Sequence, residues 1–181
     1  TIMTTTLSEA LEEAYASNPS DVVILDTLEL IHPDFKDEDG KQTAVRVVRD
    51  NVNLRAFLED DAPLNAGQEV EFVALGFDLE FPPVNTTPVP EITLTLDNVG
   101  CEIIKYLDMA ASSQDMIKMI YRPYLSTDLS VPQMIPPLTL VLSDVQANIT
   151  KITAKARMMD IGNRSFPNEN YTPKRFAGLT R

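Results

Sequence analysis

Short segments in which apolar and polar residues alternate recur along most of the chain, and this pattern limits the fold more than any other feature. Alternation with a period of two is typical of a strand with one buried face. Asp39 and Gly40 predict a hairpin turn between the first two strands, and Gly76 interrupts the alternation of the third, which predicts a β-bulge. The last two segments look like a hairpin pair. The expected strands cover residues 21–32, 43–49, 69–81, 92–96, 116–124, 138–142 and 149–158.

Two other segments have the spacing of apolar residues that is typical of a helix. Residues 6–9 form a capping box, and the helix that they begin is expected to end near residue 18. A second helical pattern follows Asn98 and includes apolar positions between residues 103 and 111. A further short turn of helix is expected at residues 54–58.

Strands outnumber helices and do not alternate regularly with them. About seven to nine strands and two short helices favour a mainly β, α+β fold over a doubly wound sheet. The expected architecture is an antiparallel β-barrel or sandwich with the two helices added. Residues 1–160 are expected to form this single β-rich domain, and residues 161–181 an extended basic arm.

The arm has little periodicity but contains isolated aromatic and apolar residues. Such spacing suggests that the arm docks in an extended form, on its own chain or on a partner. The proline-bearing loop at residues 82–90 is a second candidate contact. The candidate interface residues of the arm are Arg164, Phe166, Tyr171, Lys174, Arg175, Phe176 and Leu179.

The formal net charge of −12 is unevenly distributed. Residues 146–181 contain 7 of the 15 basic and 2 of the 27 acidic side chains, which leaves 8 basic and 25 acidic ones elsewhere. The excess of negative charge argues against sequence-independent binding to nucleic acid or anionic membranes. An acidic body with a basic tail suits head-to-tail contact between identical subunits. We expect no membrane span and, without a visible secretory signal, synthesis in the cytoplasm.

Residue types that commonly carry catalysis are scarce. Cys101 is the only cysteine, so no disulfide can form within these residues, and His32 is the only histidine. A nucleophilic pair made of the two has no local sequence signature. We therefore expect His32 to be a polar residue at the end of a strand, and Cys101 to be a small buried residue on the second helix.

Two acidic clusters resemble functional motifs but lack the full pattern. Residues 37–40 resemble the start of a calcium loop, yet Val48 occupies the position of its closing glutamate, so a solvated hairpin tip is expected. Residues 59–61 are three adjacent carboxylates, which can serve acid–base chemistry but more often form a solvated loop. With no cluster of metal ligands and no phosphate-binding loop, the sequence predicts no catalytic residue, no cofactor and no metal site.

Several segments together resemble a family of proteins encoded in the tail-gene clusters of siphophages and prophages. The resemblance runs over residues 7–179. A more distant similarity is to the amino-terminal part of siphophage tail-tip hub proteins; their cysteine-ligated cluster is not carried over, because this chain has one cysteine. The segments that carry the family resemblance are Leu7-Ser8-Glu9-Ala10, Tyr15-Ala16-Ser17, Leu28-Glu29-Leu30, His32-Pro33, residues 92–99, Tyr121-Arg122-Pro123-Tyr124-Leu125, residues 163–167, Tyr171-Thr172 and Arg175-Phe176.

The resemblance implies a structural protein of a virion, a minor tail protein of the tail tip or baseplate, and not an enzyme. Its expected partners are other tail proteins (distal tail, hub and tape measure). It is expected to form a homo-oligomeric ring or cap of roughly three or six copies near the end of the tail tube. Two alternatives stay open: an assembly chaperone that is absent from the finished particle, and a wall-degrading accessory enzyme that uses Cys101 or the acidic loop.

Overall fold

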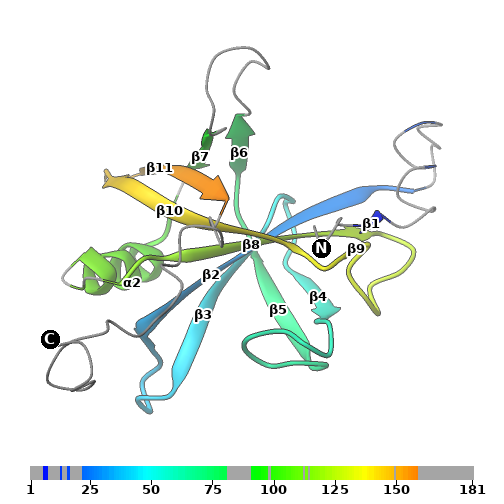
Figure 1. Cartoon of the computed structure of the whole chain (residues 1–181), viewed down its shortest axis with the longest axis horizontal. Helices are drawn as coiled ribbons and strands as arrows, with labels where there is room; N and C mark the ends of the chain where they lie inside the picture. Colours follow the sequence, from blue (N-terminus) through cyan, green and yellow to red (C-terminus); the bar gives the residue numbers. More distant parts are fainter. Residues whose placement is uncertain are drawn as a thin grey trace, which may run out of the picture.

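A computed structural model of the chain describes residues 6–7, 13, 16, 22–80, 91–97, 99–111, 113, 115–148 and 150–158 (Figure 1). Strands dominate these residues, which confirms the prediction of a mainly β chain. The elements in chain order are β1 (Thr6–Leu7), β2 (Ile24–Lys36), β3 (Gln42–Val48), β4 (Leu54–Phe57), β5 (Glu69–Ala74), β6 (Phe77–Glu80), β7 (Glu91–Asp97), α2 (Cys101–Ala111), β8 (Lys118–Leu125), β9 (Met134–Ile135), β10 (Leu138–Ala147) and β11 (Lys151–Met158).

Most of the strands belong to one 9-stranded sheet with the order β4-β5-β3-β2-β8-β10-β11-β7-β6. Neighbouring strands are antiparallel except β3 and β5, which run parallel. Within the part of the chain that the structure describes, the end strands β4 and β6 do not pair with each other, so the sheet is open. Of the two predicted architectures, the closed β-barrel is therefore wrong, as is a wholly antiparallel sheet, whereas the sandwich stays a prediction.

The sheet curls because the chain connects two distant strands by a very short link. β5 and β6 stand near opposite ends of the strand order, although only Leu75 and Gly76 separate them. The amide of Leu75 donates to the carbonyl of Val48, and the amide of Asp97 donates to the carbonyl of Gly76. These bonds bring the ends of β3 and β7 to one corner. The interruption at Gly76 is thus a crossover and not the predicted β-bulge, because the residues on its two sides pair with different strands.

The long strand β2 pairs with β3 on one side and with β8 on the other. It continues past His32 and Pro33, where the sequence predicts its end. The pairing with β3 is irregular here and resumes where Lys36 faces Gln42. Proline has no N–H to donate and is compatible with a strand where the ladder is interrupted. His32 therefore lies inside a strand and is fully buried, so its predicted position at a strand end is wrong.

Alternate residues of the central strands β2, β3 and β8 face two different cores. Leu28 and Met119 lie in a large core that also contains residues of β7, β10, β11 and α2. We call this side of the sheet the apolar face. Glu29 and Arg122 occupy alternate positions on the opposite side, where β4, β5 and the loop between them pack around Tyr124. We call this side the charged face.

Helix α2 covers one end of the large core, as its apolar spacing requires. Leu107 and Ala110 are buried in that core, and Ile103 packs against them from the first turn. The three residues recur at intervals of three and four, which puts them on one side of a helix. The helix predicted after Asn98 is confirmed.

The local patterns that form hairpins are confirmed. β2 and β3 pair through a turn in which Gly40 has φ of 77°, a conformation that glycine adopts without strain. β10 and β11 form the second expected hairpin. β7 also matches its prediction and pairs with β11 over its whole length.

Two predictions of helix are wrong, in whole or in the part that the structure describes. Residues 54–58 form strand β4 and its end instead of a helical turn, since Ala56 and Leu58 point together into the second core. Thr6 and Leu7 pair with β9 as a strand, so no helix begins at Thr6. Glu13 and Ala16 are helical, whereas the rest of the first predicted helix lies outside the described residues. Residues 82–90 and the arm also lie outside them.

Candidate functional site

One guanidinium in β8 joins three parts of the charged face. Arg122 Nε and Nη2 donate to the two carboxylate oxygens of Glu59 at 2.7 and 2.6 Å. Arg122 Nη1 donates to Oε2 of Glu29 at 2.6 Å. The side chains of Arg122 and Glu29 are 0% exposed and that of Glu59 is 6% exposed. Arg122 therefore cross-links β8 to β2 and to the loop that follows β4, inside the protein.

A second cation completes this network nearer to the surface. Arg46 Nε donates to Oε1 of Glu29 at 2.9 Å, and the Arg46 side chain is 12% exposed. Arg46 Nη2 also donates to Oδ1 of Asn65 at 2.9 Å. Asn65 has φ of 56°, a left-handed conformation that asparagine tolerates better than most residues. We call Glu29, Arg46, Glu59 and Arg122 the charged network; its two cations face two carboxylates.

The groups in and beside the charged network satisfy one another. Burial alone would lower the pKa of Arg122, but the hydrogen bonds and charges of Glu59 and Glu29 outweigh it and raise that pKa above its ordinary value. The neighbouring phenol of Tyr124 donates to the carbonyl of Phe57 at 2.8 Å, and burial raises the pKa of Tyr124. Among the described residues, no buried side-chain nitrogen or oxygen lacks a hydrogen-bond partner. The network can therefore hold elements together but presents no open group to a ligand.

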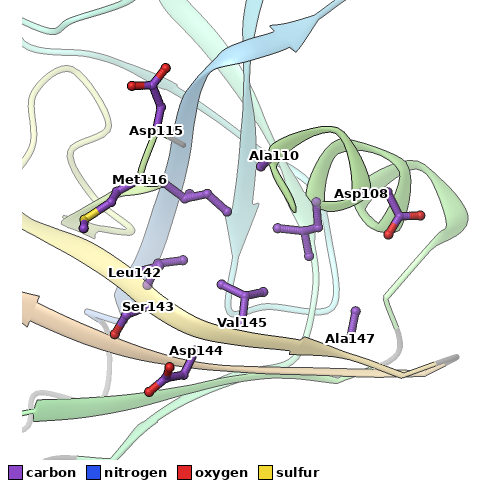
Figure 2. Close-up of a pocket in the computed structure, with 11 residues that line it drawn as sticks. Asp108, Ala110, Asp115, Met116, Leu142, Ser143, Asp144, Val145 and Ala147 are labelled. Carbon is purple, nitrogen blue, oxygen red and sulfur yellow. The ribbon is translucent and has the colours of Figure 1, made fainter. Parts of the chain in front are cut away.

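A surface pocket of about 500 Å³ lies between the end of α2 and strand β10 (Figure 2). Leu142 and Val145 point from β10 toward α2 in this view. Asp108, Asp115 and Asp144 come from three different segments and also line the pocket, and in this view their carboxylates point away from its apolar side chains (Figure 2). The pocket thus combines an apolar floor with an acidic rim, and its volume is in the range that binding pockets have.

The wall formed by β10 results from a bulge in the strand. The pairing of β10 with β11 is irregular between Ser143 and Gln146, and Asp144 has φ of 52°. An extra residue in one strand bends it and redirects the side chains that follow. Lys155 Nζ on β11 lies 3.6 Å from Oδ2 of Asp144 and 3.7 Å from Oε2 of Glu91, so it is shared between two carboxylates. Arg157 Nε also lies 2.8 Å from Oε1 of Glu91, so two cations face these two carboxylates.

The wall opposite β10 is fixed by the only histidine. The amide of Asp34 donates to His32 Nδ1 at 3.1 Å. Nε2 therefore carries the proton and donates to the carbonyl of Asp115 at 3.1 Å. The ring also packs against Phe35, with centroids 5.4 Å apart. His32 positions the segment that forms the rim at Asp115, and both of its nitrogens are engaged.

The other candidates from the sequence have different outcomes. Residues 37–40 are exposed at the β2–β3 hairpin tip, as predicted. Asp60 and Asp61 are exposed, but Glu59 is buried against Arg122, so the prediction of a solvated cluster is wrong for Glu59. Cys101 is the first residue of α2, and its side chain lies outside the described residues, as do the interface residues of the arm. In the described ranges, no group of three or more His, Cys, Asp and Glu side chains is arranged to hold a metal ion.

Sequence reasoning missed the charged network, although a signal for it exists. Glu29 stands between Leu28 and Leu30 in an apolar strand, and Arg122 stands in another apolar strand. Charged residues are seldom buried unless they are paired, so a charge flanked by apolar residues in each of two buried strands predicts a partner of opposite sign. Glu59 gives no such signal, because it looks like part of an exposed acidic loop.

Residues 10–171 match the model of a family described as a domain of unknown function (DUF1833). This range includes the charged network and the pocket. No curated protein matches the sequence. The helices among the described residues are all too short or too polar to cross a membrane.

Proposed function

We propose that this chain, which belongs to the family described as a domain of unknown function (DUF1833), is a structural component of a phage tail tip or baseplate. It would act as a minor tail protein that docks into a ring or cap near the end of the tail tube, without catalysing a reaction. The resemblance of segments such as residues 92–99 and 121–125 to phage tail-cluster proteins supports the location.

The observation that carries the architectural role is the closed charged network. In an enzyme, polar groups converge where a substrate can reach them. Here the densest convergence of charge in the described residues is buried, and Arg122 gives every one of its guanidinium nitrogens to a carboxylate. The result is a cross-link between two strands and a loop. Such a cross-link suits a protein whose task is to keep its shape under load.

The distribution of charge supports assembly by repeated contacts. Residues 159–181 contain 4 of the 15 basic side chains and 2 of the 27 acidic ones, so the remainder holds 11 basic and 25 acidic ones. A negative body and a positive arm attract each other in neighbouring copies and repel like surfaces. Contacts between different surfaces of identical copies close into a ring when the rotation permits it.

The protein composition of purified phage particles tests this role. We expect mass spectrometry to find the chain in particles that carry the gene, and gold-labelled antibodies against it to mark the tail tip. Phage that lack the gene are expected to produce defective tails and to recover when the gene is supplied in trans. Absence of the chain from particles whose assembly nevertheless requires it would replace the structural role with that of an assembly chaperone.

A separate variant tests the enzymatic alternative. Cys101→Ala removes the only thiol in the sequence. If the protein is architectural, phage carrying this variant are expected to infect as well as the parent. A large loss of infectivity, with the variant still present in particles, would contradict a role without chemistry.

A further inference from the structure

We propose that His32 and Asp34 form a switch that responds to acid, in which the neutral ring binds the main-chain amide of Asp34 and the protonated ring binds the carboxylate of the same residue. The neutral arrangement is the one that the structure shows. This inference concerns one end of β2 and does not rest on the proposed role in a phage tail.

The buried ring of His32 uses one of its nitrogens as an acceptor. The side chain is 0% exposed, and its Nδ1 accepts the hydrogen of the Asp34 amide at 3.1 Å. A ring that takes up a second proton carries a hydrogen on both nitrogens and has no acceptor left. The Asp34 amide and a protonated Nδ1 would be two donors facing each other, so this hydrogen bond must break. Nε2 can donate to the carbonyl of Asp115 in either state.

The carboxylate of Asp34 is placed to replace its own amide. Its Oδ2 lies 3.8 Å from His32 Nδ1, which is roughly 1 Å longer than a hydrogen bond between charged groups. The Asp34 side chain is 48% exposed, so packing does not hold it in place as firmly as it holds the ring. A buried cation is costly unless it is paired, and this carboxylate supplies the pair.

The backbone around Asp34 can change without disturbing the rest of the sheet. The pairing of β2 with β3 is irregular between Ile31 and Lys36, so Asp34 lies outside the regular ladder. Pro33 has no amide hydrogen to lose, and both Pro33 and Asp34 are exposed. Phe35, which follows them, is 0% exposed in the large core and anchors the strand again. The change is therefore confined to two residues.

Other titratable groups approach the ring from neighbouring elements. Asp115 presents its carbonyl to the ring, and its side chain is exposed. Tyr106 of α2 packs on Phe35, which in turn packs on the ring of His32. Lys118 of β8 pairs with the residue before His32, so its side chain points to the opposite face of the sheet. Of the described acidic side chains, that of Asp34 is the one within ion-pair distance of the ring.

Nuclear magnetic resonance of the full chain, made without a histidine tag, tests the switch. His32 is the only histidine, so its ring signals need no assignment. A pH titration follows the two ring nitrogens together with the protection of main-chain amides against hydrogen exchange. When the ring takes up its second proton, the protection factor of the Asp34 amide should fall at least about tenfold, because this amide loses its acceptor. The amides of Leu28 and Leu30, in the regular part of the ladder, should keep their protection.

Two variants that remove the same charge separate the exchange at Asp34 from a general effect of charge. In Asp34→Asn, the ring is expected to need an about threefold higher proton concentration for its second proton than in wild type, since a half-exposed pair is lost. Glu38→Gln removes a charge from the exposed hairpin tip and should titrate as wild type does. These two variants leave the ring in place, so they decide the question even if His32→Gln does not fold.

A folded His32→Gln variant has no ring to titrate, so the protection factor of its Asp34 amide should not change with acid. The switch would be overturned if the wild-type ring took up its proton while the Asp34 amide stayed protected. Loss of protection at Leu28 and Leu30 in the same step would also overturn it, because the fold would then open as a whole. Equal titrations of Asp34→Asn and Glu38→Gln would contradict the exchange of amide for carboxylate. None of these results bears on whether the chain is present in phage particles.

Discussion

On one face of β2, β3 and β8 the buried side chains are apolar, whereas on the other face the same strands bury two charges of opposite sign. The apolar face contributes Leu28 and Met119, each completely buried, to a core formed with β7, β10, β11 and α2. The charged face contributes Glu29 and Arg122, which are buried just as completely. The two faces share a backbone and differ in the side chains that they present and in the elements that pack against them.

This difference suggests that one face supplies most of the stabilising burial and that the other fixes the register of the strands. Contacts between apolar side chains depend little on direction, so a core tolerates substitutions that keep its volume. The guanidinium of Arg122 requires two carboxylates in one geometry, one from β2 and one from the loop after β4. A slip of one residue between β8 and β2 would move Arg122 to the apolar face. We therefore infer that the charged network fixes the register, while the apolar face supplies most of the burial.

The largest loss of stability is expected when Arg122 is replaced by methionine. Glu59 and Glu29 would then stay buried without the cation that compensates them, and removing one partner of a buried ion pair typically costs about 3–5 kcal/mol. Urea unfolding, followed by circular dichroism, measures this loss. If Arg122→Met costs less than about 1 kcal/mol, the charged face does not depend on its network, and the proposed difference between the two faces is wrong.

An exposed arginine provides the matched control. The Arg55 side chain is 70% exposed, and its Nε lies 3.9 Å from Oε1 of Glu71, whose side chain is 52% exposed. Arg55→Met is expected to change the free energy of unfolding by at most about 0.5 kcal/mol, because water screens such pairs. An equal effect at the two positions would mean that burial is not the cause.

A loss of about 2–5 kcal/mol is expected when Leu94 on β7 is replaced by alanine, because the large core would retain a cavity. Leu94 is 0% exposed and belongs to the core of the apolar face. Leu94→Met keeps most of the volume and should cost less than about 1.5 kcal/mol. The same urea titration applied to both variants tests this. Equal losses for the two substitutions would show that this face also demands a specific side chain.

Local parts of the fold could be predicted from sequence because their causes are local. The alternation of residues 92–96 and the turn at Asp39 and Gly40 specify a strand and a hairpin within a few residues, and both are confirmed. The helix after Asn98 likewise follows from its own spacing. The order of nine strands depends instead on pairings between distant segments, which no local pattern encodes. The sequence therefore does not distinguish an open, curled sheet from a closed barrel.

The sequence signals that Glu29 and Arg122 need partners, but it does not identify those partners, for the same reason. Arg122 and Glu59 are separated by 63 positions, and Arg122 and Glu29 by 93. Glu59 follows the pattern of a solvated loop, and only the packing of that loop on the charged face makes it buried. The pocket could not be predicted from sequence for a similar reason, because α2 and β10 are far apart in the sequence and meet only in the folded chain. The interface residues of the arm stay a prediction.

A smaller effect, of about 1 kcal/mol, is expected when the Tyr124 hydroxyl is removed from the charged face. The phenol donates to the carbonyl of Phe57 at 2.8 Å, so Tyr124→Phe leaves that carbonyl without this donor. Burial raises the pKa of Tyr124 above its ordinary value of 10.0. The stability that is present below pH 10 should therefore fall as the pH rises further, because the unfolded chain releases this proton first.

The pH dependence supplies the control for Tyr124. Urea unfolding of Tyr124→Phe between neutral pH and pH 11 should show a shallower alkaline decline than that of wild type. If the two curves fall in parallel, the phenol does not contribute to the alkaline instability.

A small effect is also expected at an ion pair on the other part of the sheet, where β11 faces β7. Arg157 Nε lies 2.8 Å from Oε1 of Glu91, and the two residues face each other across the strands. Their side chains are 48% and 36% exposed, so water competes for both charges. Arg157→Met is expected to cost about 0.2–1 kcal/mol, and 1 M salt should remove most of this difference by screening.

The response to salt therefore distinguishes the buried pairs of Arg122 from the exposed pair of Arg157 more clearly than the size of the stability loss does. The cost of Arg122→Met should be nearly the same in 0.1 M and 1 M sodium chloride, because ions do not enter the charged face. Urea unfolding of both variants at the two salt concentrations measures this contrast. If the cost of Arg122→Met also declines with salt, water and ions reach Glu29 and Glu59, and the charged network is an exposed feature of a mobile loop. If only the Arg157 pair responds, the same chemistry holds the interior rigid in one region and leaves the surface adjustable in another.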